Sequence, residues 1–190
     1  MLTVNNLKKY FDGKPVIKNL SFVCQSIGVT AVMGASGVGK TTLLNIIAGL
    51  EKSDGGSITS TFSKISYKFQ EPRLFDWLTA LENVKIVVED KQEADAIARN
   101  LLARVGLTDS LEKYPRELSG GMQQRVSLAR ALAHGGDLVL LDEPFSAVDS
   151  ETKEMLLKLI SEYAKDHAVL LVTHSREEAQ ILDSNIIVIS

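Results

Sequence analysis

The stretch 29-VTAVMGASGVGKTTLLNII-47 decides the fold, because it joins an apolar strand to an apolar helix through a glycine-rich loop. The loop fits the spacing Gly34-x-x-x-x-Gly39-Lys40-Thr41. Backbone N–H groups of such a loop can surround a phosphate, and the following helix N-terminus adds a favourable dipole. A chance match is expected in on the order of one chain in a hundred of this length. The pattern therefore predicts a triphosphate site, with Lys40 on the β and γ phosphates and Thr41 on magnesium.

A second apolar strand, 137-DLVLLDEP-144, ends in two consecutive carboxylates. Open parallel sheets bind ligands at the carboxyl ends of their strands. Alone, the Asp-Glu pair is better explained as the start of a solvated loop. Together with the phosphate loop, it predicts that Asp142 holds magnesium, through water, and that Glu143 activates the attacking water as general base.

The rest of the chain alternates between strand and helix patterns, which predicts an α/β domain. The continuous apolar runs at 137–143, 168–174 and 185–190 are typical of a parallel sheet buried on both faces. Further strands are expected at 2–7, 19–24 and 28–34, and two short ones within 56–69. Helical periodicity is expected at 41–50, 93–105, 120–133 and 153–167.

Composition restricts the classes of function. The 190 residues include 45% hydrophobic and 24% charged residues, and a chain of this length is most simply one domain. No apolar run approaches the roughly 20 residues that span a bilayer. The net charge of −3 without a basic block predicts no nucleic-acid partner. The single cysteine, Cys24, indicates a reducing, cytosolic compartment, and we expect it in the core.

Six motifs, in the order "GASGVGKTT", "FQEP", "LSGGMQQR", "LLDEP", "SAVD" and "VTH", resemble the nucleotide-binding subunit of ATP-binding cassette (ABC) transporters. The resemblance runs from Leu2 to about Ser190. It implies a single ATP-binding domain, 1–190, with the P-loop NTPase fold: a mainly parallel core sheet, a small antiparallel portion and an inserted helical subdomain at about 71–118. It also implies that two copies dimerise head to tail and enclose two ATP molecules.

The resemblance also implies roles for individual residues. Catalysis is expected from Lys40, Glu143 and His174, and magnesium binding from Thr41, Gln70 and Asp142. Tyr10, with its neighbour Phe11 as the alternative, matches the aromatic residue that stacks on adenine. The remaining nucleotide contacts are expected from Val16, Gly34, Ala35, Ser36, Gly37, Val38, Gly39, Thr42, Ser119, Gly120, Gly121 and Asp149.

The segment 119-SGGMQQR-125 begins a helix with two glycines, which cost roughly 1 kcal/mol each against alanine. The resemblance accounts for them, because Ser119, Gly120 and Gly121 would contact the ATP held by a second copy, where large side chains would block the approach. Asp149 would link the two sites across the dimer. A helix cap formed by Ser119 would explain the serine but not the two glycines, which destabilise the helix.

The function implied by the resemblance is to power the transport of a small solute across a membrane, with import favoured over export. "QEPRLFDWLT" is similar to the nitrate, sulfonate and taurine importer branch. Expected partners are a second copy, transmembrane permease subunits and a substrate-binding protein, which would place the chain in the cytoplasm on the inner face of the membrane. Phe75, Trp77 and Leu78 would contact the permease or fill the core. The alternative function is a mechanical clamp in DNA repair or translation.

Overall fold

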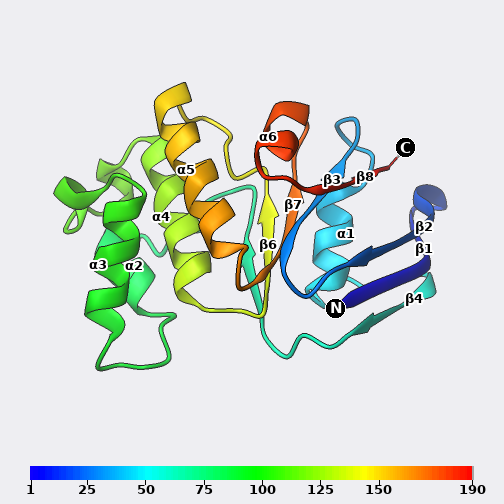
Figure 1. Cartoon of the computed structure of the whole chain (residues 1–190), viewed down its shortest axis with the longest axis horizontal. Helices are drawn as coiled ribbons and strands as arrows, with labels where there is room; N and C mark the ends of the chain where they lie inside the picture. The colour runs from blue at the N-terminus through cyan, green and yellow to red at the C-terminus, as the bar shows by residue number, and fades with distance from the viewer. Residues whose placement is uncertain (190) are drawn as a thin grey trace.

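The computed structural model describes residues 1–189 and contains two β-sheets (Figure 1). The larger is wholly parallel, with the strand order β5-β6-β7-β3-β8. Its strands are β3 (Gly28–Met33), β5 (Ile65–Lys68), β6 (Leu138–Asp142), β7 (Ala168–Val172) and β8 (Asn185–Val188). The smaller is antiparallel in the order β2-β1-β4, from β1 (Leu2–Phe11), β2 (Lys14–Cys24) and β4 (Gly55–Ser60). This arrangement confirms the predicted parallel core with a small antiparallel portion.

Helices cover both faces of the parallel sheet, as Figure 1 shows. Helix α1 (Lys40–Ile47) lies between the two sheets, and α4 (Gly120–Ala133) and α5 (Ser150–Tyr163) lie on the opposite face. Beyond α4, helices α2 (Ala80–Lys85) and α3 (Ala94–Arg104) form one end of the molecule. A short helix, α6 (Arg176–Ile181), and two 3-10 turns, Thr108–Ser110 and Pro115–Glu117, complete the fold.

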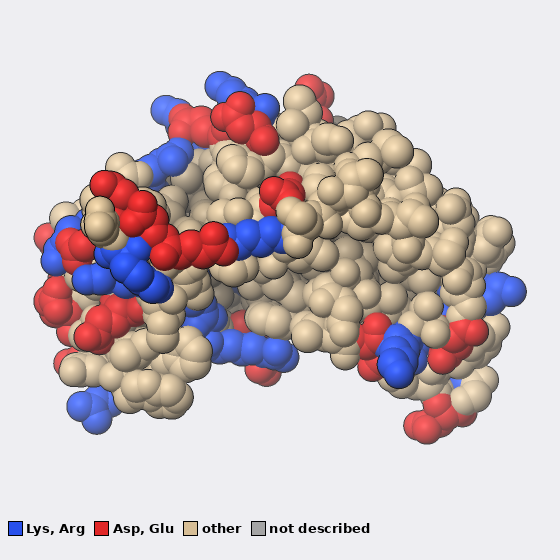
Figure 2. Space-filling view, turned by 90° about the horizontal axis from the view of Figure 1, so that it is seen from below, with Lys and Arg blue, Asp and Glu red and all other residues tan. Residues whose placement is uncertain are grey.

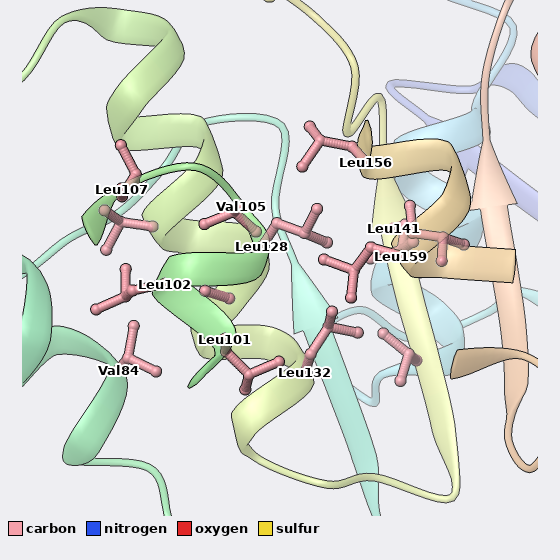
Figure 3. Packing of buried hydrophobic residues seen from close by; sticks show 14 of the residues in the cluster. Val84, Leu101, Leu102, Val105, Leu107, Leu128, Leu132, Leu141, Leu156 and Leu159 are labelled. Carbon is pink, nitrogen blue, oxygen red and sulfur yellow. The ribbon is translucent and has the colours of Figure 1, made fainter. Parts of the chain in front are cut away.

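The two faces of the parallel sheet contribute side chains to two separate hydrophobic clusters. Leu138 and Leu140 of β6 pack with α1 and the antiparallel sheet, whereas Val139 and Leu141 pack toward α4 and α5. Successive strand residues point to opposite faces, so a strand buried on both faces must be apolar throughout. Figure 3 shows the cluster on the α4 and α5 side, whose labelled members include Leu101 and Leu102 of α3, Val105 just after α3, Leu128 and Leu132 of α4, and Leu156 and Leu159 of α5.

Several elements differ from the sequence-based expectation. Helix α2 was not predicted, although Thr79 and Glu82 form a capping box at its start. Helix α5 begins at Ser150 rather than at residue 153, because Asp149 caps it. The last strand ends at Val188, and Ser190, where the prediction placed the end of that strand, lies outside the described residues. Cys24 is buried, as expected.

Charged side chains are unevenly placed on the face that Figure 2 shows. Acidic and basic groups alternate over the end formed by α2 and α3, where Asp95 pairs with both Lys85 and Arg99. The middle of this face carries few charges. Where charges do gather, the two signs are interspersed and form no large block of one sign. Within residues 1–189, no helix combines the length and the hydropathy needed to cross a bilayer.

Candidate nucleotide-binding and hydrolysis site

A pocket opens over the glycine-rich loop at the carboxyl end of β3. It joins segments far apart in the chain, because the tip of the β1–β2 hairpin, the start of α1, the segment after β5 and the end of β6 all reach it. The lining residues are Phe11, Val16, Ser36, Gly37, Gly39, Lys40, Thr41, Thr42, Gln70 and Glu143. Gly34, Ala35 and Val38 belong to the same loop but do not line this pocket.

The loop needs a glycine at its last position before α1. Gly39 has a φ of 101°, in the left-handed region, and a Cβ built on it would lie 2.8 Å from Cγ1 of Val16. The following helix α1 begins at Lys40. Its first backbone N–H groups therefore face the pocket without a side chain at Gly39 to cover them.

Lys40 lies along the same loop. Its side chain is buried, and Nζ donates hydrogen bonds to the carbonyl oxygens of Gly34 and Ala35, both at 2.9 Å. These contacts hold the ammonium group over the loop, where oxygens of a bound phosphate would meet it. The two hydrogen bonds thus hold the long Lys40 side chain in one position.

Thr41 and Asp142 form the pair expected to hold magnesium. Oγ1 of Thr41 donates to Oδ2 of Asp142 at 2.8 Å, although 101 positions separate the two residues. Burial raises the pKa of the Asp142 carboxyl, an effect that the Thr41 hydrogen bond opposes. A bound cation would favour the charged carboxylate.

The oxygen ligands present suit magnesium, which is usually held through one or two carboxylates together with substrate phosphates. Gln70 also lines the pocket. Among residues 1–189, no three His, Cys, Asp or Glu side chains gather as a metal cluster, so a metal at this pocket would depend on phosphate oxygens as well.

Glu143 follows β6 directly and has a φ of 44°, which is unusual for a residue with a side chain. Its N–H donates to the carbonyl of Val172 at 3.0 Å, and its own carbonyl accepts from Oγ of Ser146 at 3.0 Å. Its Oε1 lies 3.8 Å from Nδ1 of His174, whose side chain is 75% exposed. The predicted general base and the predicted histidine therefore lie side by side beside the phosphate loop.

The structure favours Phe11, the alternative, over Tyr10 as the aromatic residue of this pocket. Phe11 lines the pocket with Val16, and the ammonium of Lys9 lies 4.9 Å from the centre of its ring. Tyr10 is not among the lining residues, and the adenine contact of either ring stays a prediction. Neighbouring residues of a strand point to opposite faces, so only one of the two can face the pocket.

The other predicted contacts lie away from this pocket, and their local roles differ. Ser119 and Gly120 are exposed at the start of α4, where Oγ of Ser119 accepts from the N–H of Met122 at 3.3 Å. A Cβ on Gly120 would meet nothing within 4 Å, whereas one on Gly121 would lie 2.6 Å from the carbonyl oxygen of Ala147. Packing within the chain thus explains Gly121 but not Gly120.

Asp149 has a helix-capping role in the structure. Its carboxylate accepts from the backbone N–H of Thr152 at 2.9 Å and from the Thr152 hydroxyl at 2.8 Å. These hydrogen bonds lower the pKa of Asp149, because they stabilise the charged form. The carboxylate remains exposed at the surface that also carries the start of α4 and Ala147.

Two groups beside the site were not predicted from the sequence. Lys68, at the end of β5, is fully buried and contacts the carbonyls of Asp142 and Glu143; burial lowers the pKa of Lys68 to about 8. Glu178 accepts from the Thr173 hydroxyl and pairs with Lys153 at 3.2 Å, which fixes the backbone just before His174. For Lys68, the available signal in the sequence was a lysine at the end of a short strand.

Comparison with known proteins adds to this geometry. The ABC transporter family model matches residues 17–146. The chain is 41% identical over 182 residues to the aliphatic sulfonates import ATP-binding protein SsuB 1 of Pseudomonas syringae pv. syringae (strain B728a), covering 95% of this chain and 76% of that protein. It is 40% identical to the bicarbonate transport ATP-binding protein CmpD of Synechocystis sp. (strain PCC 6803), covering 100% and 74%.

A solved structure is similar over the whole fold. The ATP-binding cassette MJ0796, in a dimeric post-hydrolysis state bound to ADP and phosphate, matches with a TM-score of 0.89 and 31% identity, covering 100% of this chain and 94% of that one. The motifs, the P-loop fold and these relatives agree. The chain belongs to the ABC transporter family, as an ATP-binding subunit that hydrolyses ATP with magnesium.

Proposed function

We propose that this subunit powers import of small organic anions, with aliphatic sulfonates as the substrate class. The observation that carries the proposal is the 41% identity to a sulfonate import ATP-binding protein over 95% of the chain. A bicarbonate transport relative at 40% identity also handles an anion. The comparisons do not favour the alternative, a clamp in DNA repair or translation.

Within one chain, residues in the pocket and beside it have separate roles in hydrolysis. Lys40 and the loop N–H groups would bind the β and γ phosphates, while Thr41, Asp142 and Gln70 would hold magnesium. When bound, magnesium neutralises charge on the phosphate oxygens and orients them. Glu143 takes a proton from the attacking water, and His174, 3.8 Å from it, positions that water against the γ-phosphate.

A second copy would complete each site. Ser119 and Gly120 are exposed and outside the pocket of their own chain, which supports a role toward a partner's ATP. Their helix, α4, is 14 residues long and presents its N-terminus to that partner. Asp149 lies at the same surface, in position to connect the two sites.

Residues 71–118 act as the helical subdomain of a single domain spanning 1–190. Helices α2 and α3 pack against α4 through one hydrophobic cluster, so a force on this end reaches the start of α4. Trp77 is 73% exposed and its ring centre lies 5.3 Å from that of Phe75, so Trp77 is free to contact a permease helix. Binding to the permease would hold the subunit at the cytoplasmic face of the membrane.

Phe11→Ala is expected to weaken ATP binding by roughly 5-fold or more, because stacking on a base contributes about 1–3 kcal/mol. Equilibrium titration with a fluorescent ATP analogue would measure the change. Tyr10→Ala is the matched control, and its affinity should stay within twofold of the unmodified chain. The reverse ranking would restore Tyr10 as the adenine contact.

The function is tested by purifying the tagged chain from its own cells with its membrane partners. We expect a multispanning permease and a substrate-binding protein, and calorimetry of that binding protein should show binding of ethanesulfonate or taurine. A binding protein that takes only peptides or sugars would contradict the substrate class. Recovery of ribosomes or DNA in place of a permease would contradict transport itself.

A further inference from the structure

Lys68 is a fully buried lysine whose contacts reach the hydrolysis site. It is the last residue of β5, the strand at the edge of the parallel sheet beside β6. Its Nζ donates to the carbonyl oxygen of Asp142 at 3.2 Å and to that of Glu143 at 3.5 Å. Burying an ammonium group costs free energy that an apolar side chain at this place would not.

The backbone that Lys68 contacts is strained. Glu143 has a φ of 44°, in the left-handed region, where a residue with a Cβ is strained. Three donors meet its carbonyl: the N–H of Ser146 at 3.3 Å, the Ser146 hydroxyl at 3.0 Å and Nζ of Lys68. They fix the peptide unit that follows Glu143, and with it the direction in which the carboxylate leaves the strand.

We propose that Lys68 is a positioning residue for ATP hydrolysis, which holds the carbonyls of Asp142 and Glu143 so that both carboxylates face the phosphate loop. The inference rests on the proposed role of Glu143 as general base. Lys68 does not line the pocket, so it acts through Glu143 and Asp142 rather than by touching ATP. Either protonation state of its amine can donate these hydrogen bonds.

The test is the Lys68→Met variant, which keeps the unbranched shape of the side chain up to the last atom and removes the donors. We expect kcat for ATP to fall on the order of 10- to 100-fold, the range that a misplacement of about 1 Å can produce. KM and the ATP dissociation constant should stay within twofold, because the phosphate loop is untouched. A merely structural role would lower stability without this split between kcat and KM.

Two further variants sharpen the measurement. Lys64→Met is the matched control, because Lys64 lies just before β5 but pairs with Glu89 at the surface, and its kcat should be unchanged. Ser146→Ala removes another donor to the same carbonyl and should lower kcat less, in the same direction. Thermal unfolding shows whether Lys68→Met is folded. If it is not, Lys68→Gln takes its place, and its kcat is also expected to fall.

The outcomes separate this inference from the proposed function. Full kcat in a folded Lys68 variant, with Glu143→Gln inactive in the same assay, overturns the role of Lys68 alone. Undiminished turnover in Glu143→Gln would overturn the base and this inference together. Adding Lys68→Met to the Glu143→Gln variant should lower the residual rate much less than Lys68→Met lowers the rate of the unmodified chain, because the part of the effect that passes through Glu143 is already lost.

Discussion

Replacement of Glu143 by glutamine is expected to lower ATP turnover by at least about 100-fold, because general acid–base catalysis contributes 10²–10⁴-fold. Glutamine keeps the shape of the side chain but cannot accept the proton of the attacking water. ATP affinity should not fall, because the contacts of Lys40 and Thr41 remain and a carboxylate near the γ-phosphate has lost its charge. The ATP-bound dimer should therefore accumulate rather than turn over.

Phosphate release under saturating ATP measures the first effect, and molecular mass in solution with ATP and magnesium measures the second. Glu177→Gln is the matched control, since Glu177 is an exposed carboxylate in the first turn of α6, just beyond His174. Its turnover should equal that of the unmodified chain. Undiminished hydrolysis in Glu143→Gln would remove Glu143 from its catalytic role.

Gly120→Glu should abolish the ATP-dependent dimer without lowering the stability of the chain. A Cβ at Gly120 meets nothing within 4 Å, so the new side chain fits the isolated subunit. Removing a glycine from a helix gains up to about 1 kcal/mol, and an acidic residue near a helix N-terminus adds roughly 0.3–1 kcal/mol. In the dimer, the same carboxylate would face the γ-phosphate of the partner and repel it.

This prediction is best measured in the Glu143→Gln background, by molecular mass with ATP and magnesium and by thermal unfolding without them. Gly121→Ala provides the contrast, because its Cβ would lie 2.6 Å from the carbonyl oxygen of Ala147 and should lower the stability of the monomer. A Gly120→Glu chain that still forms the ATP-dependent dimer would mean that the start of α4 does not face the partner's nucleotide.

Much of the fold could be predicted from the sequence, because its signals are local. The phosphate loop lies between a strand and a helix whose residues are contiguous, and the uniformly apolar strands β6 and β7 indicate burial on both faces. Short elements were harder to predict. Helix α2 has six residues, too few for a repeating apolar pattern, and its capping box was the available signal. The choice between Tyr10 and Phe11 depended on how the β1–β2 hairpin meets the loop.

By itself, then, the sequence determined the phosphate loop, the paired carboxylates and the order of all strands and of the longer helices, since each depends on residues close together in the chain. Only the tertiary structure decided that Thr41 donates directly to Asp142, that Gly121 makes room for Ala147 and that Lys68 contacts the carbonyl of Glu143, 75 positions away. Such contacts arise when the strands of the parallel sheet end at one edge, and packing between distant segments leaves no periodic pattern in the sequence.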